Sequence, residues 1–327
     1  MRLVLSLFIS ILFCQSIVAQ NNTSSIFRFL DVTPAANAAA LGGNHVGLYS
    51  ADFSLLNLNP AYLNADASGK ISATYLNFFS DANMGFTNGA FHLDGIGTFA
   101  AGIRFMGYGD FEYLDENGNN LGGFNANDFS FTTAYSLELT ENLNVGAGID
   151  IIHSSYSTFK STAAAISGGL FYRDTTSHFS AGLSIRNLGG QISAFDERRE
   201  PLPLDISAGI TKKPEAFPFQ LSLTLRKLND WDLRVFGESE KPAFVKNLFR
   251  HIIAGGEASF TENFNIRLGY DYYLHEQTSS GSDFDLAGIA FGVGFKVKMI
   301  LVDISRSSYS KLGGVTRLSI KTDLFDL

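Results

Sequence analysis

Cysteine, charge and long apolar runs are all scarce in this chain of 327 residues. Charged residues make up 17% of the sequence, against roughly 25% in soluble globular proteins. Past residue 20, no apolar run approaches the roughly 18 residues that a membrane-spanning helix requires, which excludes a helical membrane protein. A hydrophobic fraction of 45% argues against disorder, and the excess of 32 acidic over 24 basic residues argues against a nucleic-acid partner.

The first residues have the features of a secretory signal peptide. Arg2 supplies one positive charge, an apolar stretch runs from Leu3 to Phe13, and small residues end at Ala19. We expect cleavage after Ala19, so that residues 1–19 are removed. The single cysteine, Cys14, lies in this segment, and the bulky residues before it do not suit a lipid-attachment site. The mature chain would therefore contain no disulfide and no thiolate metal site.

Most of the remaining sequence alternates with a period of two. From residue 287 to residue 297, apolar side chains alternate with small or polar ones, and successive side chains of a strand point to opposite faces. The same alternation occurs at 143–151, 178–186, 219–226 and 264–271. We count about fourteen such segments, which start near residues 70, 85, 97, 128, 143, 162, 178, 205, 218, 251, 264, 285, 299 and 315.

Three features of these segments favour a membrane barrel over a soluble β-sandwich. Many segments reach the roughly 9–11 residues that a tilted strand needs to cross a bilayer. Many carry tyrosine or phenylalanine near their ends, where aromatic girdles lie. Long and short connections also alternate, as they do in bacterial outer-membrane barrels. The long connections, expected to be extracellular, are 107–127, 187–204, 228–250 and 274–284.

The predicted fold class is therefore all-β, an antiparallel transmembrane β-barrel of about 14 strands that spans residues 70–327. Because hydrocarbon cannot satisfy backbone N–H and C=O groups, spanning strands must close on themselves. The apolar rows would then contact lipid, and the glycines and polar side chains would face the lumen. With an even number of strands, both termini and the short turns lie on the periplasmic side of an outer membrane.

Residues 20–69 precede the first predicted strand. The alanine-rich run from Ala35 to Leu41 favours a short helix, which Gly42 and Gly43 would end, and a new turn starts near residue 59. We expect this segment to form a short helical hatch inside the lumen, where small luminal side chains leave space. The alternative is a flexible periplasmic tail, although the segment is apolar for a tail in water.

Two motifs of this segment are Ala39-Ala40-Leu41-Gly42-Gly43 and, just before the first predicted strand, Asn59-Pro60-Ala61. Together they resemble the hatch of FadL-type outer-membrane proteins, in which fourteen strands surround an N-terminal plug. The segments 105–111, 115–118 and 124–128 are similar to the loop after strand three in the PorV/PorQ group of that superfamily, which belongs to the type IX secretion system of Bacteroidetes. The chain length and the moderate loops are more similar to the PorQ branch than to the longer PorV branch. The hatch motif residues are Leu41, Gly42, Gly43, Asn59, Pro60 and Ala61.

The resemblance implies a non-enzymatic subunit of the attachment complex that processes secreted cargo. Proteins of the PorQ branch hold a surface protein of the PorZ type beside the sortase PorU and the cargo shuttle PorV. The expected partners are therefore outer-membrane lipid and such surface proteins, and no cofactor is expected. The same hatch leaves open a second function, a FadL-like outer-membrane transporter for hydrophobic small molecules.

The long loops contain aromatic and arginine side chains, which are typical of protein interfaces. For Tyr113 and Trp231, an interfacial girdle or packing within the loop is an equal alternative. The candidate partner-docking residues are Tyr113, Phe195, Arg198, Arg199, Trp231 and Arg234.

Enzyme signatures are weak. Residues 95–100 fit part of a dinucleotide-binding loop but lack a strand-to-helix context. Ser157 and Ser308 each begin a Ser-x-x-Lys pattern, but no Lys-Thr-Gly accompanies them. The six histidines have no metal-ligand spacing. We therefore predict no enzymatic activity and no metal site, and an outer-membrane hydrolase is a third hypothesis.

Overall fold

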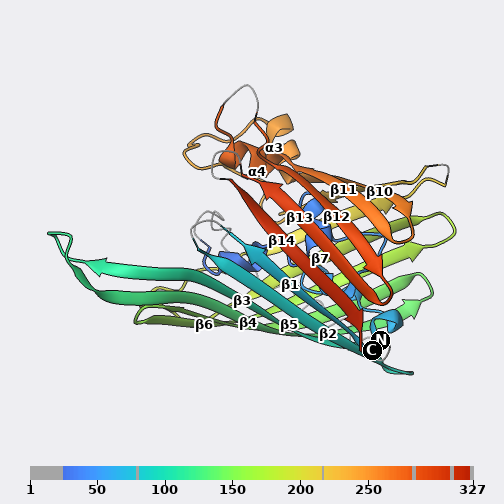
Figure 1. Ribbon diagram of the computed structural model, residues 1–327, viewed down its shortest axis with the longest axis horizontal. Coiled ribbons are helices and arrows are strands. Elements are labelled where there is room, and N and C mark those ends of the chain that lie inside the picture. The colour runs from blue at the N-terminus through green and yellow to red at the C-terminus, as the bar shows by residue number, and fades with distance from the viewer. Residues whose placement is uncertain (1–24, 79–80, 216, 282–284, 310–312, 325–327) are drawn as a thin grey trace, which may run out of the picture.

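The computed structural model describes residues 25–78, 81–215, 217–281, 285–309 and 313–324, so the predicted signal peptide lies outside the described residues. Over these residues, fourteen antiparallel strands close into one barrel in which β1 pairs with β14 (Figure 1), and this confirms the predicted fold class. The strands are β1 (Lys70–Asn77), β2 (Asn83–Leu93), β3 (Gly97–Leu114), β4 (Asn120–Thr140), β5 (Leu143–Tyr156), β6 (Phe159–Asp174), β7 (Phe179–Ser193), β8 (Asp205–Lys212), β9 (Phe219–Leu225), β10 (Ile252–Thr261), β11 (Phe264–Asp271), β12 (Ile289–Val297), β13 (Ile300–Ser308) and β14 (Gly314–Asp323).

The alternating sequence separates an apolar outer surface from a polar inner one. On β5, Ile149 and Ile151 are 54% and 47% exposed on the outside, while Asp150 between them is 3% exposed on the inside. The same period of two in burial recurs along β1 and β9. An apolar surface of this extent around a closed barrel is characteristic of proteins embedded in lipid.

The two ends of the barrel differ. At one end, which we call the short-turn end, β4 and β5 are joined by residues 141–142 and β10 and β11 by residues 262–263. The opposite, long-loop end holds α3 (Phe244–His251) between β9 and β10, and α4 (Tyr272–Thr278) after β11 (Figure 1). Over the described residues, no helix is both long and apolar enough to cross a membrane.

One expected loop is instead a pair of strands. Residues 107–127 were predicted as a long connection, but β3 and β4 continue through most of it and leave only residues 115–119 between them. Beyond Gly107, β3 has no pairing with β2, so residues 108–125 form a two-stranded hairpin that projects from the barrel wall (Figure 1). Cross-strand aromatic packing stabilises it, because the rings of Phe111 and Phe124 stack with their centroids 5.1 Å apart.

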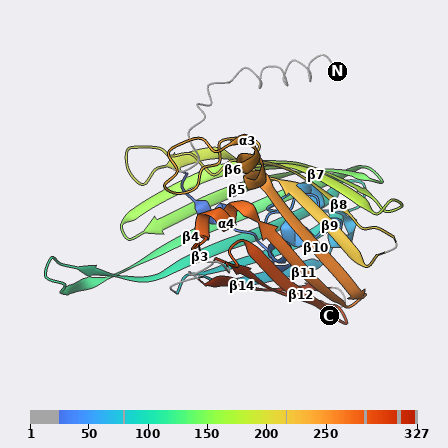
Figure 2. The ribbon, with the colours of Figure 1, turned by 90° about the horizontal axis from the view of Figure 1, so that it is seen from above.

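Residues 25–69 fold inside the barrel as short helices and turns, surrounded by strands in the view of Figure 2. Their contacts reach strands on opposite sides of the barrel. The backbone N–H of Ala36 donates to Ser319 Oγ on β14 at 2.8 Å, and Ser180 Oγ on β7 donates to the Gly47 carbonyl at 2.8 Å. We call residues 25–69 the plug. Its helices are η2 (Arg28–Asp31), α2 (Ala36–Ala40), η3 (Phe53–Leu55), η4 (Pro60–Tyr62) and η5 (Ala65–Ala67).

Candidate functional site

The first hatch motif lies where the plug meets β10 and β11. Leu41 is 2% exposed, and its backbone packs directly against Gly255 and Gly269. A Cβ atom on Gly269 would lie 1.9 Å from the Leu41 carbonyl carbon, so only glycine allows this approach. Gly42 has φ +103°, a conformation that other residues rarely adopt, and it ends α2 as the sequence predicts.

The second hatch motif ties the plug to itself and to the opposite wall. Asn59 is fully buried, and its Oδ1 atom accepts from the backbone N–H of Ala61 at 3.0 Å, which caps η4. Its Nδ2 atom donates to the carbonyls of Val46 at 3.0 Å and Leu170 of β6 at 3.1 Å. An amide side chain suits this position because it both accepts and donates. Pro60 occupies the first helical position, where no N–H is needed.

Two buried polar side chains of the plug were missed by the sequence reasoning. His45 Nε2 donates to the Leu41 carbonyl at 2.9 Å, and His45 Nδ1 lies 3.0 Å from Thr224 Oγ1 of β9. Burial lowers the pKa of His45 to about 4, so the ring is neutral at pH 7. The hydroxyl of Tyr62 accepts from Leu48 N–H at 2.7 Å and donates to the His45 carbonyl at 3.2 Å. These bonds hold the plug in one conformation.

A third buried group, Asp52, forms an ion pair between the plug and the wall. Its carboxylate contacts Lys321 Nζ of β14 and accepts from Asn37 Nδ2 at 2.7 Å. Burial alone would raise the pKa of Asp52, but the charge of Lys321 and the hydrogen bonds from Lys321 and Ser54 together outweigh burial and lower the pKa. Lys321 also lies 3.2 Å from Asp303 of β13. No sequence motif marks this pair, since its members are 269 positions apart.

The plug does not fill the short-turn end of the lumen. A cavity of about 800 Å³ remains there between the plug and the wall. Its lining combines apolar plug residues, including Leu41, Leu48 and Phe53, with charged wall residues such as Arg267 and Lys321. The side chain of Arg267 bonds to Asp303 at 2.6 Å, so much of this charge is paired.

An apolar cluster lies in the lumen toward the long-loop end, next to the buried ion pair of Arg104 and Asp150. The plug contributes Phe27, Phe29 and Leu30, each 3% exposed or less, and the strands around them direct apolar side chains inward. We call this set the luminal apolar cluster. Its other members are Leu76, Met84, Phe86, Met106, Ile152, Ala163, Ala165 and Val315 on the strands, and Leu202 in the loop between β7 and β8.

Charged side chains surround the rim of the long-loop end. A second cavity, of about 460 Å³, is lined there by residues that include Asp31, Asp205, Arg226, Lys227 and Tyr273. Arg226 forms an ion pair with Asp271.

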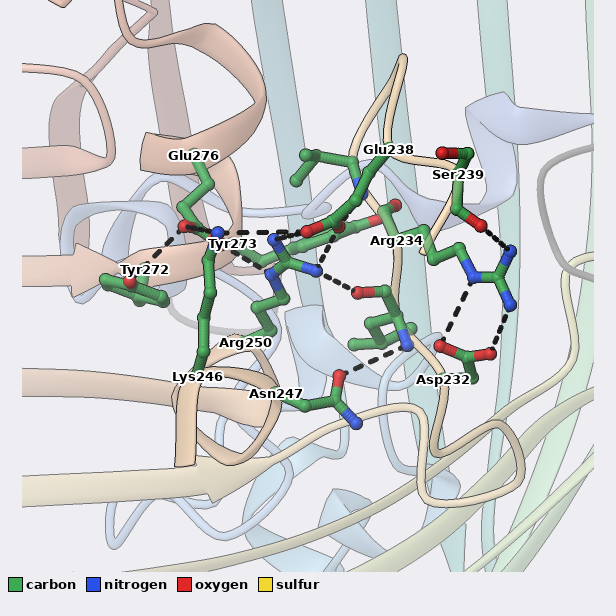
Figure 3. Close-up of polar contacts among 12 residues, drawn as sticks. Asp232, Arg234, Glu238, Ser239, Lys246, Asn247, Arg250, Tyr272, Tyr273 and Glu276 are labelled. Carbon is green, nitrogen blue, oxygen red and sulfur yellow. Dashed lines mark hydrogen bonds and ion pairs between the residues drawn. The ribbon is translucent and has the colours of Figure 1, made fainter. Parts of the chain in front are cut away.

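Beside this cavity, Arg250 of α3 is fully buried and bonds to Glu238 at 2.6 Å and to Glu276 of α4 (Figure 3). The hydrogen bonds from Arg250 lower the pKa of Glu238, so the cluster is charged at neutral pH.

The structure does not bring the candidate docking residues together. Tyr113 lies on the projecting hairpin, 45% exposed, and Trp231 lies in the loop between β9 and β10. Phe195 packs against the plug, with its ring 6.2 Å from that of Phe27. Arg234 forms an ion pair with Asp232 and donates to the Ser239 carbonyl at 3.1 Å (Figure 3). Arg198 and Arg199 are exposed.

The residues considered for catalysis have ordinary structural positions. Ser157 occupies the turn between β5 and β6, and its hydroxyl pairs with that of Tyr113. Ser308 ends β13, far around the barrel from Ser157. Within the described part of the chain, no three histidine, cysteine or carboxylate side chains gather into a metal site.

The fold, its apolar outer surface and its filled lumen define a transmembrane β-barrel closed by an N-terminal plug. Similar solved structures are barrels of the FadL type. The toluene transporter TodX of Pseudomonas putida has a TM-score of 0.55 at 13% identity, over 90% of this chain and 99% of that chain. A Pseudomonas aeruginosa FadL homologue has a TM-score of 0.51 at 12% identity, over 90% of this chain and 98% of that one.

A third barrel, the CymD monoaromatic hydrocarbon channel, has a TM-score of 0.51 at 13% identity and covers 91% of this chain and 98% of its own. At such identities the likeness shows the fold alone, which is that of a FadL-like barrel. No family model matches the chain. No curated protein matches it either.

Proposed function

We propose that this protein is an outer-membrane channel for small hydrophobic molecules, with the long-loop end extracellular and the short-turn end periplasmic. The observation that supports it best is the luminal apolar cluster. The lumen of a water-filled porin is polar. Here apolar side chains from β1, β2, β3, β5, β6 and β14 pack around the plug in part of the lumen, next to the Arg104–Asp150 ion pair.

The groups that occupy the middle of this cluster belong to the plug. Phe27 and Phe29 precede α2, and Phe27 has φ +54°, an uncommon conformation for a bulky residue. Residues held in such conformations are often found at ligand clamps and switches. A displacement of residues 26–30 would leave an apolar chamber. An aromatic or aliphatic molecule about as large as the displaced side chains could then occupy it.

A route then continues toward the periplasm. Between the luminal apolar cluster and the 800 Å³ cavity stand α2 and η4, which are held by His45, Asn59 and Asp52. The plug therefore acts as the gate of the proposed channel. TodX is a toluene transporter and CymD is a monoaromatic hydrocarbon channel, so toluene is a suitable first probe.

Filling the luminal apolar cluster should block uptake. Ala163 of β6 is fully buried in the cluster, and its neighbour Ala164 faces the other way. Because a phenyl ring would occupy the volume a ligand needs, we expect Ala163→Phe to reduce uptake of radiolabelled toluene about tenfold, the loss that corresponds to 1.4 kcal/mol. The host would be a Gram-negative strain without another barrel of this fold.

Ala164→Phe is the matched control, since it adds the same ring to the lipid-facing side of the same strand, and uptake should stay unchanged. Equal uptake by cells with and without the wild-type protein would reject the channel proposal.

The projecting hairpin supports a second candidate function, a barrel subunit of the type IX attachment complex similar to PorQ. Residues 105–159 contain no lysine or arginine, and four acidic residues lie at positions 110, 112, 115 and 116. Phe111 and Tyr113 are 41% and 45% exposed on one face of the hairpin. An isolated two-stranded ribbon is only marginally stable, so contact with a partner would stabilise this hairpin. Its acidic and aromatic side chains suit a partner that carries basic residues.

Shortening the hairpin tests this candidate. Joining Tyr108 to Ala126 through a short glycine turn should abolish recovery of a PorZ-like surface protein with the tagged barrel from solubilised outer membrane. The same change should release that protein into the medium. The barrel itself should stay folded, as shown by a shift in its gel migration on boiling. Unchanged surface retention after loss of the hairpin argues against an anchoring role.

A further inference from the structure

Helix α3 at the long-loop end has its polar side inward and its apolar side outward. Asn247, Arg250 and His251 are buried, whereas Phe244 and Phe249 are 68% and 50% exposed. A surface helix in water shows the opposite arrangement, because its apolar stripe faces the protein core. The apolar face of α3 is therefore directed away from the protein interior.

Polar contacts fix α3 in this orientation. Arg250 donates to the Leu233 carbonyl at 2.6 Å and forms ion pairs with Glu238 and Glu276 (Figure 3). Asn247 accepts from Leu233 N–H at 3.3 Å and donates to the Trp231 carbonyl. Rotating the helix to bury its aromatic residues would leave these groups without hydrogen-bond partners, which destabilises a buried polar group.

The exposed apolar residues form one continuous surface. The ring of Trp231 stacks on His251 with a centroid distance of 4.5 Å and lies 6.0 Å from that of Phe244. Val245 is 61% exposed and stands one helical turn before Phe249. We call Trp231, Phe244, Val245 and Phe249 the α3 patch.

The barrel wall beneath this patch is short. Strand β9 has 7 residues and β8 has 8, whereas β5, β6 and β7 have 14, 16 and 15. Seven residues at about 3.3 Å each, tilted by about 40°, rise only about 18 Å, and the apolar band of an outer-membrane barrel is about 25 Å tall. The chain turns at the short-turn end directly before β9, so the missing height lies at the long-loop end.

Helix α3 occupies that position. Its last residue, His251, bonds to the Arg226 carbonyl at 2.7 Å, directly after β9, and the next residue, Ile252, pairs with Leu225 of β9. The α3 patch therefore continues the lipid-facing surface of β9 and β10 upward.

We propose that the α3 patch is a lipid contact, and that α3 lies in the leaflet at the long-loop end with its apolar face among the acyl chains. The helix replaces the membrane-facing surface that short strands β8 and β9 do not supply. Trp231 is thereby part of the membrane girdle and not a docking residue for a surface protein.

The single tryptophan of the chain makes this testable without a mutation in the patch, because all tryptophan emission comes from Trp231. The wild-type protein would be reconstituted into phosphatidylcholine–phosphatidylglycerol vesicles with and without bromine on the acyl chains. An interfacial helix buries its apolar face about 5–10 Å deep, so bromine near the headgroup should reduce the emission about twofold and mid-chain bromine less. Aqueous acrylamide should have little effect.

The matched control is a Trp231→Phe, Leu121→Trp variant, which moves the tryptophan to the tip of the β3–β4 hairpin, where Leu121 is 69% exposed. Its emission should respond to acrylamide and not to brominated lipid. If Trp231 in the wild-type protein behaves like this control, the patch faces water and the lipid proposal is overturned in favour of a docking surface for another protein.

Discussion

Replacing Gly269 with valine should displace the plug and turn a closed barrel into a conducting one. A Cβ atom at this position would lie 1.9 Å from the Leu41 carbonyl carbon and 2.1 Å from the Gly42 nitrogen. Both are backbone atoms, so neither can rotate away. Overpacking of this kind costs up to about 3 kcal/mol, which raises the undocked fraction roughly 100-fold. Conductance in planar bilayers measures that fraction directly.

Two further variants separate plug release from general misfolding. Gly182→Val acts on the other side of the lumen, where its Cβ would lie 1.7 Å from the Val46 carbonyl oxygen, and it should also open the barrel. Gly256→Val is the control, since its Cβ would face outward, 3.6 Å from the nearest atom, a methyl group of Leu221. If both inward variants retain a native barrel and remain closed, the plug does not gate the lumen.

Removing the carboxylate of Asp205 should be among the most destabilising single changes in the wall. Asp205 and Arg186 stand directly opposite each other on β8 and β7, and they are 2% and 1% exposed. Asp205 also accepts from Ser207 Oγ at 2.7 Å. Asp205→Ala leaves a buried guanidinium without its counter-ion, so we expect the free energy of unfolding to fall by about 3–5 kcal/mol. Urea unfolding in lipid vesicles measures the change.

The double variant Arg186→Leu, Asp205→Leu should recover most of this loss, because it leaves no uncompensated charge in the lumen. Arg234→Ala serves as a comparison, since the ion pair of Arg234 with Asp232 is about one quarter exposed and should contribute much less to stability than the buried pair. If Asp205→Ala lowers the free energy of unfolding by no more than Arg234→Ala does, the assigned role of the buried pair is contradicted.

Much of the wall could be predicted from the sequence because its signal is local. Lipid outside and small or polar groups inside impose a period of two on every strand, and the observed strands start at or near most of the predicted positions. The misplacement of β4 has a local cause. Residues 120–127 contain two adjacent glycines and alternate poorly, and only their pairing with β3 makes them a strand.

The sequence predicts that the plug is a helical segment, but it does not predict which strands the plug contacts. The turn at Gly42 and the cap at Asn59 depend on neighbours in sequence and were visible there. The partners of His45, Asp52 and Asn59 lie on β9, β14 and β6, more than a hundred residues away, and nothing local indicates them.

Composition and alternation alone determined that this chain is a barrel with lipid on its outside and that its N-terminal segment enters the lumen. Both conclusions follow from how each residue type interacts with hydrocarbon and water. Only the tertiary structure decided which glycines admit the plug, that the luminal apolar cluster exists, and that α3 turns its polar side inward. Those features arise where distant strands meet, and the chemistry of one residue cannot reveal what stands across a closed barrel.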